Sequence, residues 1–156
     1  MCGFVSIHTE NKNLSDSFPI LDKMLSKITH RGPDGEGKTY IPNKAIFGHR
    51  RLAIIDIENG QQPMCSEDQR FTIVFNGEIY NYIELREMLK KEGVFFRTSS
   101  DTEVLFKLLI KKGTDSLEFL NGMFSFIFHD SKTNNWIVAR DHFGIKPLYY
   151  AQCGSD

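Results

Sequence analysis

The 156-residue chain has the composition of one ordinary globular domain, with 40% hydrophobic and 25% charged residues. Its net charge is −1 and its basic residues are scattered, so it shows no electrostatic footprint for nucleic acid or an anionic membrane. The longest apolar runs are far shorter than the roughly 18 residues of a transmembrane helix, and no secretory signal precedes them. We therefore expect one cytoplasmic domain with a small-molecule partner, and no nucleic acid or membrane as partner.

Cysteine and histidine positions give no sign of a disulfide framework or a metal centre. The three cysteines, Cys2, Cys65 and Cys153, are odd in number and widely spaced, unlike those of a disulfide-stabilised domain. The five histidines show no zinc-ligand spacing. The segment GPDGEG is neither a phosphate-binding loop nor a dinucleotide fingerprint. We therefore expect no metal and no cofactor in this chain.

The first half of the chain predicts a strand, a helix and a hairpin. Residues 4–8 have the composition of a short strand, and residues 18–28 carry apolar side chains at helical spacing. The glycine-rich stretch HRGPDGEG, residues 30–37, predicts a loop. The β-rich segments KTYI, residues 38–41, and AIFGHRRLAIID, residues 45–56, are separated by Pro42 and Asn43, which favours a hairpin.

The second half predicts two helices between strands. Residues 70–82, RFTIVFNGEIYNY, predict a strand that meets a sharp turn at the Asn76-Gly77 dipeptide. We expect a helix over residues 83–91 and a second helix from SDTE, where Ser100 and Glu103 have capping-box spacing. Residues 122–130, 136–141 and 145–150 predict three more strands. This order favours an α+β fold in which two helices cover one face of a sheet.

Cys2 directly follows the initiator methionine. Once Met1 is removed, one residue carries both a thiol and a free α-amine. An α-amine titrates at about pH 8, so near neutral pH part of it is unprotonated and can accept the thiol proton. Cys2 is therefore either an N-terminal nucleophile that carries its own base, or a small buried residue at the start of a strand.

Asn76 and Gly77 are candidate donors for an oxyanion. A cysteine that attacks a carbonyl carbon creates a negatively charged oxygen, which needs hydrogen-bond donors already in place. Asn76 offers a side-chain NH₂, and Gly77 offers a backbone N–H that no Cβ obstructs. The alternative is a dipeptide that only makes a turn.

Arg51, Asp101 and Glu78 are candidate groups for a charged ligand. Arg51 lies in the apolar segment RLAII, where a guanidinium must reach solvent or find an anion such as a substrate carboxylate. Asp101, in the first turn of a predicted helix, either complements the helix dipole or binds a substrate ammonium. Glu78 could do either or remain solvated. With Cys2, these residues would bind an α-amino acid headgroup and attack a carbonyl of its side chain.

Seven motifs resemble the class II glutamine amidotransferase domain at the N-terminus of glutamine-dependent asparagine synthetases. In chain order they are MCGF, RGPDG, HRRLAIID, NGEIYN, SDTEV, GMFSF and RDHFGIKPLYY, which span nearly the whole chain. The resemblance implies a four-layer αββα sandwich of the N-terminal nucleophile hydrolase type over residues 1–156. It also implies Cys2 as nucleophile, Asn76 and Gly77 as oxyanion hole, and a glutamine pocket formed by Arg51, Leu52, Ile54, Ile55, Glu78 and Asp101.

The resemblance also implies an activity. In this family the cysteine thiolate attacks the amide carbon of L-glutamine, ammonia leaves, and water hydrolyses the thioester to glutamate. The ammonia would serve asparagine synthesis from aspartate. ATP and magnesium are expected only in a separate synthetase domain, whose SGGxDS loop this sequence lacks. The implied partners are L-glutamine and an ammonia-accepting synthetase domain or partner chain.

The sequence departs from the family in two places. Ser6 replaces a glycine found in many members, a change that we expect to leave activity intact. The family domain continues with more strands beyond PLYY, so we expect a domain that is incomplete at its C-terminus and has no synthetase domain. Two alternatives stay open: a non-catalytic glutamine-binding or interaction fragment, and an N-terminal cysteine hydrolase that acts on another amide.

Overall fold

The computed structural model describes residues 1–9 and 14–152, and its strands form two antiparallel sheets. The first sheet has the order β1-β3-β2, with β1 at Gly3–His8, β2 at Gly35–Ile41 and β3 at Ala45–Arg51. Both outer strands pair with β3, so Gly3 faces Arg50 and Gly35 faces Arg51. This register brings the N-terminal residues and the end of β3 to the same end of the sheet.

The second sheet has the order β4-β5-β6-β7. Its strands are β4 at Met64–Cys65, β5 at Phe71–Ile79, β6 at Gly122–Asp130 and β7 at Asn135–Arg140. β5 and β6 pair along their whole length, but β4 pairs only with Thr72 and Ile73 of β5. The edge of β5 beyond Ile73 therefore has no neighbouring strand on the β4 side within the described residues.

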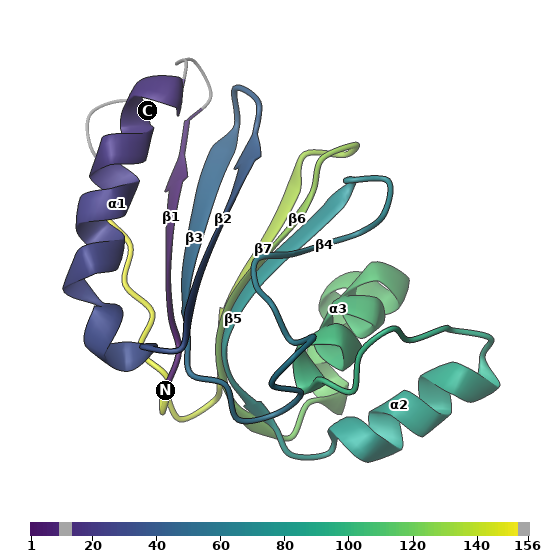
Figure 1. Cartoon of the computed structure of the whole chain (residues 1–156). Coiled ribbons are helices and arrows are strands. Elements are labelled where there is room, and N and C mark those ends of the chain that lie inside the picture. The colour runs from purple at the N-terminus through teal and green to yellow at the C-terminus, as the bar shows by residue number, and fades with distance from the viewer. Residues whose placement is uncertain (10–13, 153–156) are drawn as a thin grey trace.

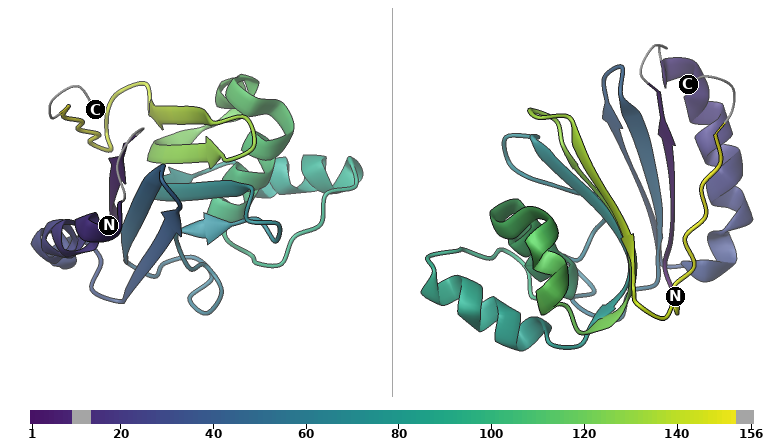
Figure 2. Two further views of the ribbon diagram at one scale, coloured as in Figure 1. Left: turned by 90° about the horizontal axis from the view of Figure 1, so that it is seen from above. Right: turned by 180° about the vertical axis from the view of Figure 1, so that it is seen from behind.

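The helices lie on the outer faces of the two sheets, which face each other (Figure 1; Figure 2). Helix α1, Phe18–Lys27, packs against β1 and β3, whereas α2, Tyr82–Lys91, and α3, Asp101–Lys112, lie on the β5 side. Short 3₁₀ segments occupy Leu14–Ser17, Thr29–Arg31 and Gly113–Phe119. The expected pair of helices over one sheet face is confirmed, and α1 covers the other sheet.

Apolar side chains fill each of the three spaces between these layers. Leu21, Leu25 and Ile46 are fully buried between α1 and the first sheet. Ala45, Phe47 and Val74 meet between the two sheets. The largest cluster joins the second sheet to α2 and α3 through Phe75, Phe126, Leu85, Leu89, Leu105 and their neighbours. Full burial of a side chain of this size contributes about 1.5–3 kcal/mol, so these layers hold the strand ends of the site in place.

The helix ends follow the sequence signals. The Ser100 hydroxyl accepts a hydrogen bond from the Glu103 N–H at 3.2 Å, as expected for an N-cap. Gly93 after α2 and Gly113 after α3 have φ values of 81° and 55°, a conformation that glycine adopts without a steric penalty. The start of α3, which carries Asp101, is therefore fixed by local sequence.

The predicted turn at Asn76-Gly77 is wrong. β5 continues through both residues, which face Ser125 and Phe124 of β6. Glycine is required at position 77 because a Cβ there would overlap the carbonyl oxygen of Met123 and lie 2.7 Å from the Phe124 Cα. The dipeptide therefore reflects a close approach of two strands and not a reversal of the chain.

Two expectations around β2 and β3 also need correction. β3 ends at Arg51 instead of running to residue 56, because side chains replace the ladder partners: Leu52 N–H donates to the Cys2 sulfur and Ala53 N–H to Asp34. The stretch over residues 30–37 is only partly a loop, since β2 begins at Gly35. A Cβ on Gly37 would overlap the backbone of Gln62, so this glycine lets another loop approach the strand.

Residues 145–150 do not form the predicted strand. Pro147 has no N–H to donate, and the N–H groups of Ile145 and Lys146 donate to the Asp141 carboxylate. Tyr149 and Tyr150 are at least 90% exposed. None of the helices in the described residues is long and apolar enough to cross a membrane.

Candidate active site

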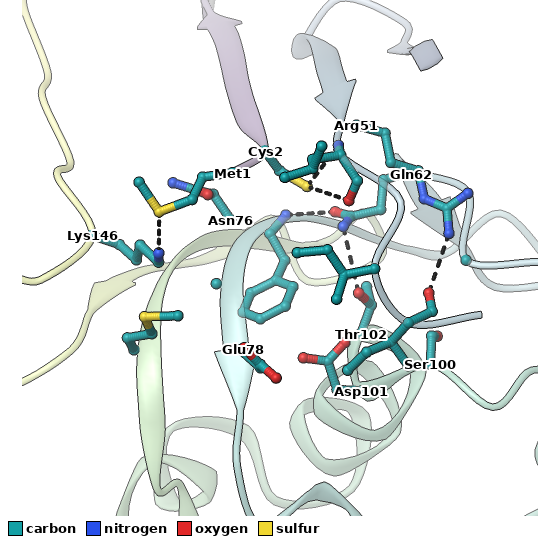
Figure 3. A pocket seen from close by; sticks show the side chains of 17 residues that line it. Met1, Cys2, Arg51, Gln62, Asn76, Glu78, Ser100, Asp101, Thr102 and Lys146 are labelled. Carbon is teal, nitrogen blue, oxygen red and sulfur yellow. Dashed lines mark hydrogen bonds between the residues drawn. The ribbon is translucent and has the colours of Figure 1, made fainter. Parts of the chain in front are cut away.

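One pocket lies where the ends of β1, β3 and β5 meet the start of α3 (Figure 3). All nine residues singled out from the sequence line it: Cys2, Arg51, Leu52, Ile54, Ile55, Asn76, Gly77, Glu78 and Asp101. They come from four separate segments of the chain. Figure 3 shows Cys2 and Asn76 toward one end of this pocket and the carboxylates of Glu78 and Asp101 toward the other.

The Cys2 thiol is held by the backbone of Leu52. The Leu52 N–H donates to the sulfur at 3.3 Å, and the Leu52 carbonyl lies 3.6 Å from the same atom. The Arg31 guanidinium donates to the Cys2 carbonyl at 3.0 Å. Cys2 is a free, half-buried thiol, whereas Cys65 lies on β4 outside this pocket and Cys153 lies outside the described residues. A thiolate here would gain a backbone hydrogen bond at once.

The open edge of β5 presents alternate N–H groups to the pocket. Phe75 N–H donates to the Gln62 side chain at 2.7 Å, and Ile79 N–H donates to the Asp101 carboxylate at 3.0 Å. Gly77 lies between them with the same parity, so its N–H points to the same side. Among the described residues this N–H has no hydrogen-bond partner. It is a donor that the fold leaves available in the pocket.

Asn76 adds a second unused group. Its side chain is 4% exposed, and its Oδ1 is buried without a hydrogen-bond partner in the described part of the chain. Buried amides are nearly always hydrogen-bonded, so an unpaired one that lines a pocket is a place where a ligand fits. Because Oδ1 can only accept a hydrogen bond, the donor that Asn76 could offer a ligand oxygen, beside the Gly77 N–H, is its Nδ2–H₂ group.

Arg51 forms hydrogen bonds with backbone carbonyls of the chain, which the sequence did not indicate. Its guanidinium donates to three backbone carbonyls, those of Ile55 at 3.3 Å, Asp56 at 2.6 Å and Ile57 at 2.7 Å. A Cβ on Gly60 would lie 2.6 Å from the same guanidinium. Arg51 therefore holds the loop that forms one wall of the pocket. Three of its five N–H groups are used, and two remain for an anion.

The loop wall is apolar toward the pocket. Leu52 and Ile55 are half-buried, whereas Ile54 is 66% exposed. The Asp56 carboxylate accepts from the Ser99 N–H at 2.6 Å, which ties the loop to the start of α3. These contacts give the pocket a fixed apolar wall between its two polar ends.

Asp101 and Glu78 make the far end acidic. Burial raises the pKa of Asp101, the nearby charge of Glu78 acts in the same direction, and the Ile79 and Thr102 N–H groups oppose the shift. Neither carboxylate forms an ion pair within the described residues. A ligand ammonium placed here would favour the ionised form of Asp101.

Gln62 is a site residue that the sequence analysis missed. Its carbonyl oxygen accepts from Phe75 N–H at 2.7 Å, and its amide lies 3.4 Å from the Thr102 hydroxyl. It therefore joins β5 to α3 next to Asn76. No residue pattern marks Gln62, because its role depends on a loop folding against a strand that is distant in sequence.

Lys146 is a second site residue that was missed. It lines the pocket, is 1% exposed, and donates to the sulfur of Met1 at 2.6 Å (Figure 3). Lysine is almost never fully buried without a charged partner. A lysine within the apolar stretch FGIKPLYY was the signal that could have identified it.

The described residues contain no cluster of three histidine, cysteine or acidic side chains that could hold a metal ion. The chemistry available to the pocket is that of a thiol beside the N-terminus, unpaired polar groups from Asn76 and Gly77, and an acidic end. This set suits nucleophilic attack on a carbonyl carbon of a ligand that carries an ammonium group.

Comparisons with known proteins agree with this chemistry. A family model described as a glutamine amidotransferase domain matches residues 1–156. The glutamine-hydrolysing asparagine synthetase 1 of Bacillus subtilis (strain 168) is 46% identical over 153 residues, which cover 96% of this chain and 24% of that protein. A probable glutamine-hydrolysing asparagine synthetase of Dictyostelium discoideum is 39% identical and covers 96% of this chain and 27% of that protein. The chain thus spans about a quarter of the length of these relatives.

The solved structures extend the likeness to the fold. Glutamine phosphoribosylpyrophosphate amidotransferase from B. subtilis superposes with a TM-score of 0.76 at 25% sequence identity. The match covers 99% of this chain and 40% of that structure. The fold of two antiparallel sheets with flanking helices is therefore shared with a solved amidotransferase structure.

Proposed function

Because the chain belongs to the glutamine amidotransferase domain family and matches the N-terminal region of asparagine synthetases, we propose that it hydrolyses L-glutamine to glutamate and ammonia. The observation that carries the proposal is the single pocket that brings Cys2, the unpaired groups of Asn76 and Gly77, and the acidic end together. We assign the fold to the N-terminal nucleophile hydrolase type on the same grounds.

The two polar ends of the pocket suit the two ends of glutamine. Asp101 and Glu78 would receive the α-ammonium, and the two unused N–H groups of Arg51 would bind the α-carboxylate. Leu52 and Ile55 would pack against the methylene groups of the side chain. This placement puts the side-chain amide toward Cys2.

The first half-reaction forms a thioester. The free α-amine of Cys2, present once Met1 is removed, takes the thiol proton, and the sulfur attacks the amide carbon. The carbonyl oxygen becomes an oxyanion that Asn76 Nδ2–H and Gly77 N–H stabilise. The α-amine then gives its proton to the departing nitrogen, the C–N bond breaks, and ammonia leaves.

The second half-reaction regenerates the thiol. The α-amine takes a proton from water as the oxygen attacks the thioester carbon, and the same donors stabilise the second oxyanion. The C–S bond breaks, the sulfur recovers a proton, and glutamate leaves. Every step uses groups of this chain, so ATP and magnesium are assigned to the reaction that consumes the ammonia.

We propose asparagine synthesis from aspartate as that consuming reaction, carried out by a synthetase domain or a partner chain. The names of the full-length relatives support this assignment. It is separate from the glutaminase proposal, because a working glutamine site does not depend on which acceptor follows.

The test measures ammonia release from L-glutamine by the processed chain. We expect activity that is lost in Cys2→Ala and kept in Cys65→Ala, and that requires the free α-amine and α-carboxylate of the substrate. Equal hydrolysis of N-acetylglutamine would instead indicate a general amide hydrolase. A glutamine-dependent rise in Tm with no ammonia release would indicate a non-catalytic binding module.

A further inference from the structure

The Lys146 ammonium is a buried cation with a poor partner. It is 1% exposed, and its side-chain hydrogen bond among the described residues goes to the Met1 thioether at 2.6 Å. An ammonium has three N–H donors, and a thioether is a weak acceptor. The proposed mechanism requires that Met1 has already been removed, so the group that contacts Lys146 in this structure is absent from the processed chain.

The backbone fixes Lys146 relative to the oxyanion donors. The Asp141 carboxylate accepts hydrogen bonds from the N–H groups of Phe143, Ile145 and Lys146 at 3.2, 2.9 and 3.0 Å. The same carboxylate accepts from Phe124 N–H at 3.1 Å, and Phe124 faces Gly77 across the β5–β6 ladder. The loop is therefore anchored to the strand that borders the oxyanion site.

Ionisable groups from four segments of the chain act on this lysine. Burial and the Arg31 guanidinium lower the pKa of Lys146, whereas Asp141, Glu78 and Cys2 oppose the shift. The opposing interactions with acidic groups favour the charged form. Among these groups, Cys2 and Glu78 line the pocket with Lys146, so the lysine charge acts on the site itself.

We propose that Lys146 is a positioning residue of the glutamine site, whose ammonium is released from the Met1 sulfur by N-terminal processing and then stabilises the Cys2 thiolate. The inference rests on the proposed function for its role in glutamine hydrolysis. A cation beside a cysteine favours the thiolate, which is the reactive form. Lys146, in the segment that follows β7, thus adds a second cationic group to the one that the protonated α-amine of Cys2 provides.

The experiment follows the alkylation of Cys2 by iodoacetamide between about pH 5 and pH 10. It uses the whole chain after intact-mass confirmation that Met1 is absent, and peptide masses separate Cys2 from Cys65 in the same molecule. The variants are Lys146→Met, which keeps length but removes charge, and Lys146→Arg, which restores it. Lys91→Met, at the exposed end of α2, is the matched control.

We expect Lys146→Met to slow Cys2 alkylation about tenfold at neutral pH, because the plot of rate against pH shifts to higher pH by about one unit. The limiting rate at high pH should not change. Lys146→Arg should stay within about threefold of wild type, and Lys91→Met should match it. Cys65 should react alike in all variants. Overlapping Cys2 curves for Lys146→Met and wild type, with both proteins folded by circular dichroism, would overturn the inference.

The alkylation readout does not need glutamine turnover. If the wild type released no ammonia but the Lys146→Met curve moved as expected, the proposed function would fail while the effect of Lys146 on Cys2 stood. If ammonia release were normal and the Cys2 curve did not move, the Lys146 role alone would fail.

Discussion

Gly77 faces Phe124 across the β5–β6 ladder, yet both backbone polar groups of Phe124 bond to Asp141. The Asp141 N–H donates to the Phe124 carbonyl at 2.7 Å, and the Asp141 carboxylate accepts from the Phe124 N–H at 3.1 Å. Because an antiparallel residue directs both groups to one side, Phe124 has none left for Gly77. The Gly77 N–H therefore points to the opposite edge, which is the edge that lines the pocket.

A side chain at position 77 should damage both the ladder and the site. The Cβ of Gly77→Ala would meet backbone atoms of Met123 and Phe124, which cannot move aside as a flexible side chain can. We expect a loss of about 1–3 kcal/mol in the free energy of unfolding and loss of ammonia release. Urea unfolding measures the first effect. Gly35→Ala is the matched strand control, since its Cβ would meet only the Arg51 Cβ at 3.8 Å; equal stability of the two variants would contradict the close approach.

Removal of the Asn76 amide should affect the chemical step more than binding. Asn76→Ala is expected to lower kcat about 10²–10³-fold, the usual cost of one oxyanion donor, with KM changed only a few-fold. Asn76→Asp should be at least as slow, because a carboxylate would repel the oxyanion. Steady-state kinetics of glutamine hydrolysis separate the two parameters. A raised KM with an unchanged kcat would assign Asn76 to substrate binding instead.

The raised pKa of Asp101 predicts that glutamine binding weakens as the pH falls, starting at a higher pH than the titration of an exposed aspartate would give. Its carboxylate must be ionised to hold an ammonium, and burial makes it take up a proton at a higher pH than an exposed aspartate does. We expect the KM of the wild type for glutamine to rise as the pH falls through the pKa of Asp101. The KM of Asp101→Asn should be higher than that of the wild type at neutral pH and should not change with pH. The measurement is KM against pH for both proteins. A parallel pH dependence in the variant would show that another group titrates.

The raised pKa of Asp101 also determines how its contribution to the stability of the fold changes with pH. A carboxyl whose folded pKa is raised stabilises the folded chain in its protonated form, and that contribution is lost as the pH rises through the folded pKa. Asp101→Asn should therefore be no less stable than wild type at neutral pH, although it binds glutamine poorly. An Asp101→Asn variant that is stable but binds glutamine poorly would show that the substitution removed a contact with the substrate and did not disrupt the fold.

The Arg70–Asp130 pair should stabilise the fold away from the site. Arg70 Nε and Nη2 donate to the two Asp130 oxygens at 2.8 and 2.7 Å, and this guanidinium holds the pKa of Asp130 well below its usual range. Because the Arg70 side chain is 34% exposed, solvent screens the pair, and we expect Arg70→Met to lower the free energy of unfolding at neutral pH only modestly.

The stability lost in Arg70→Met should depend on pH in one direction. A lowered carboxyl pKa gives stability that is present above about pH 4 and is lost as the pH falls toward the folded pKa. The difference between wild type and Arg70→Met in urea unfolding should therefore shrink below about pH 4. Lys90→Met, which breaks the exposed Lys90–Glu87 pair on α2, should change the free energy of unfolding less than Arg70→Met does. A pH-independent difference for Arg70→Met would refute the ion-pair account.

Local signals predicted most elements because they act within a few residues. The Ser100 cap and the glycines after α2 and α3 mark helix ends through contacts that the sequence itself contains. The predicted turn at Asn76-Gly77 was wrong for the opposite reason: the glycine is needed because Met123 and Phe124, more than 40 residues away in the sequence, pack closely against it. The same dipeptide supports a turn or a tight strand pair, and only the tertiary partner decides between them.

The pocket shows a similar division. The motifs placed Cys2, Asn76 and Asp101 in one site because each carries a chemical group with a recognisable use. The sequence did not predict Gln62 or Lys146. Gln62 bonds to the open edge of β5, and Lys146 is buried beside the N-terminus. Neither role exists until distant segments pack together.

The central claim is most directly tested by intact-mass spectrometry after incubation with 6-diazo-5-oxo-L-norleucine, a glutamine mimic that alkylates an activated thiol. We predict loss of Met1 and one adduct, located on Cys2, absent from Cys2→Ala and present in Cys65→Ala. Excess L-glutamine should slow its formation. A folded, processed chain whose Cys2 stays unmodified would contradict the account, because the pocket would then lack either glutamine recognition or an activated nucleophile.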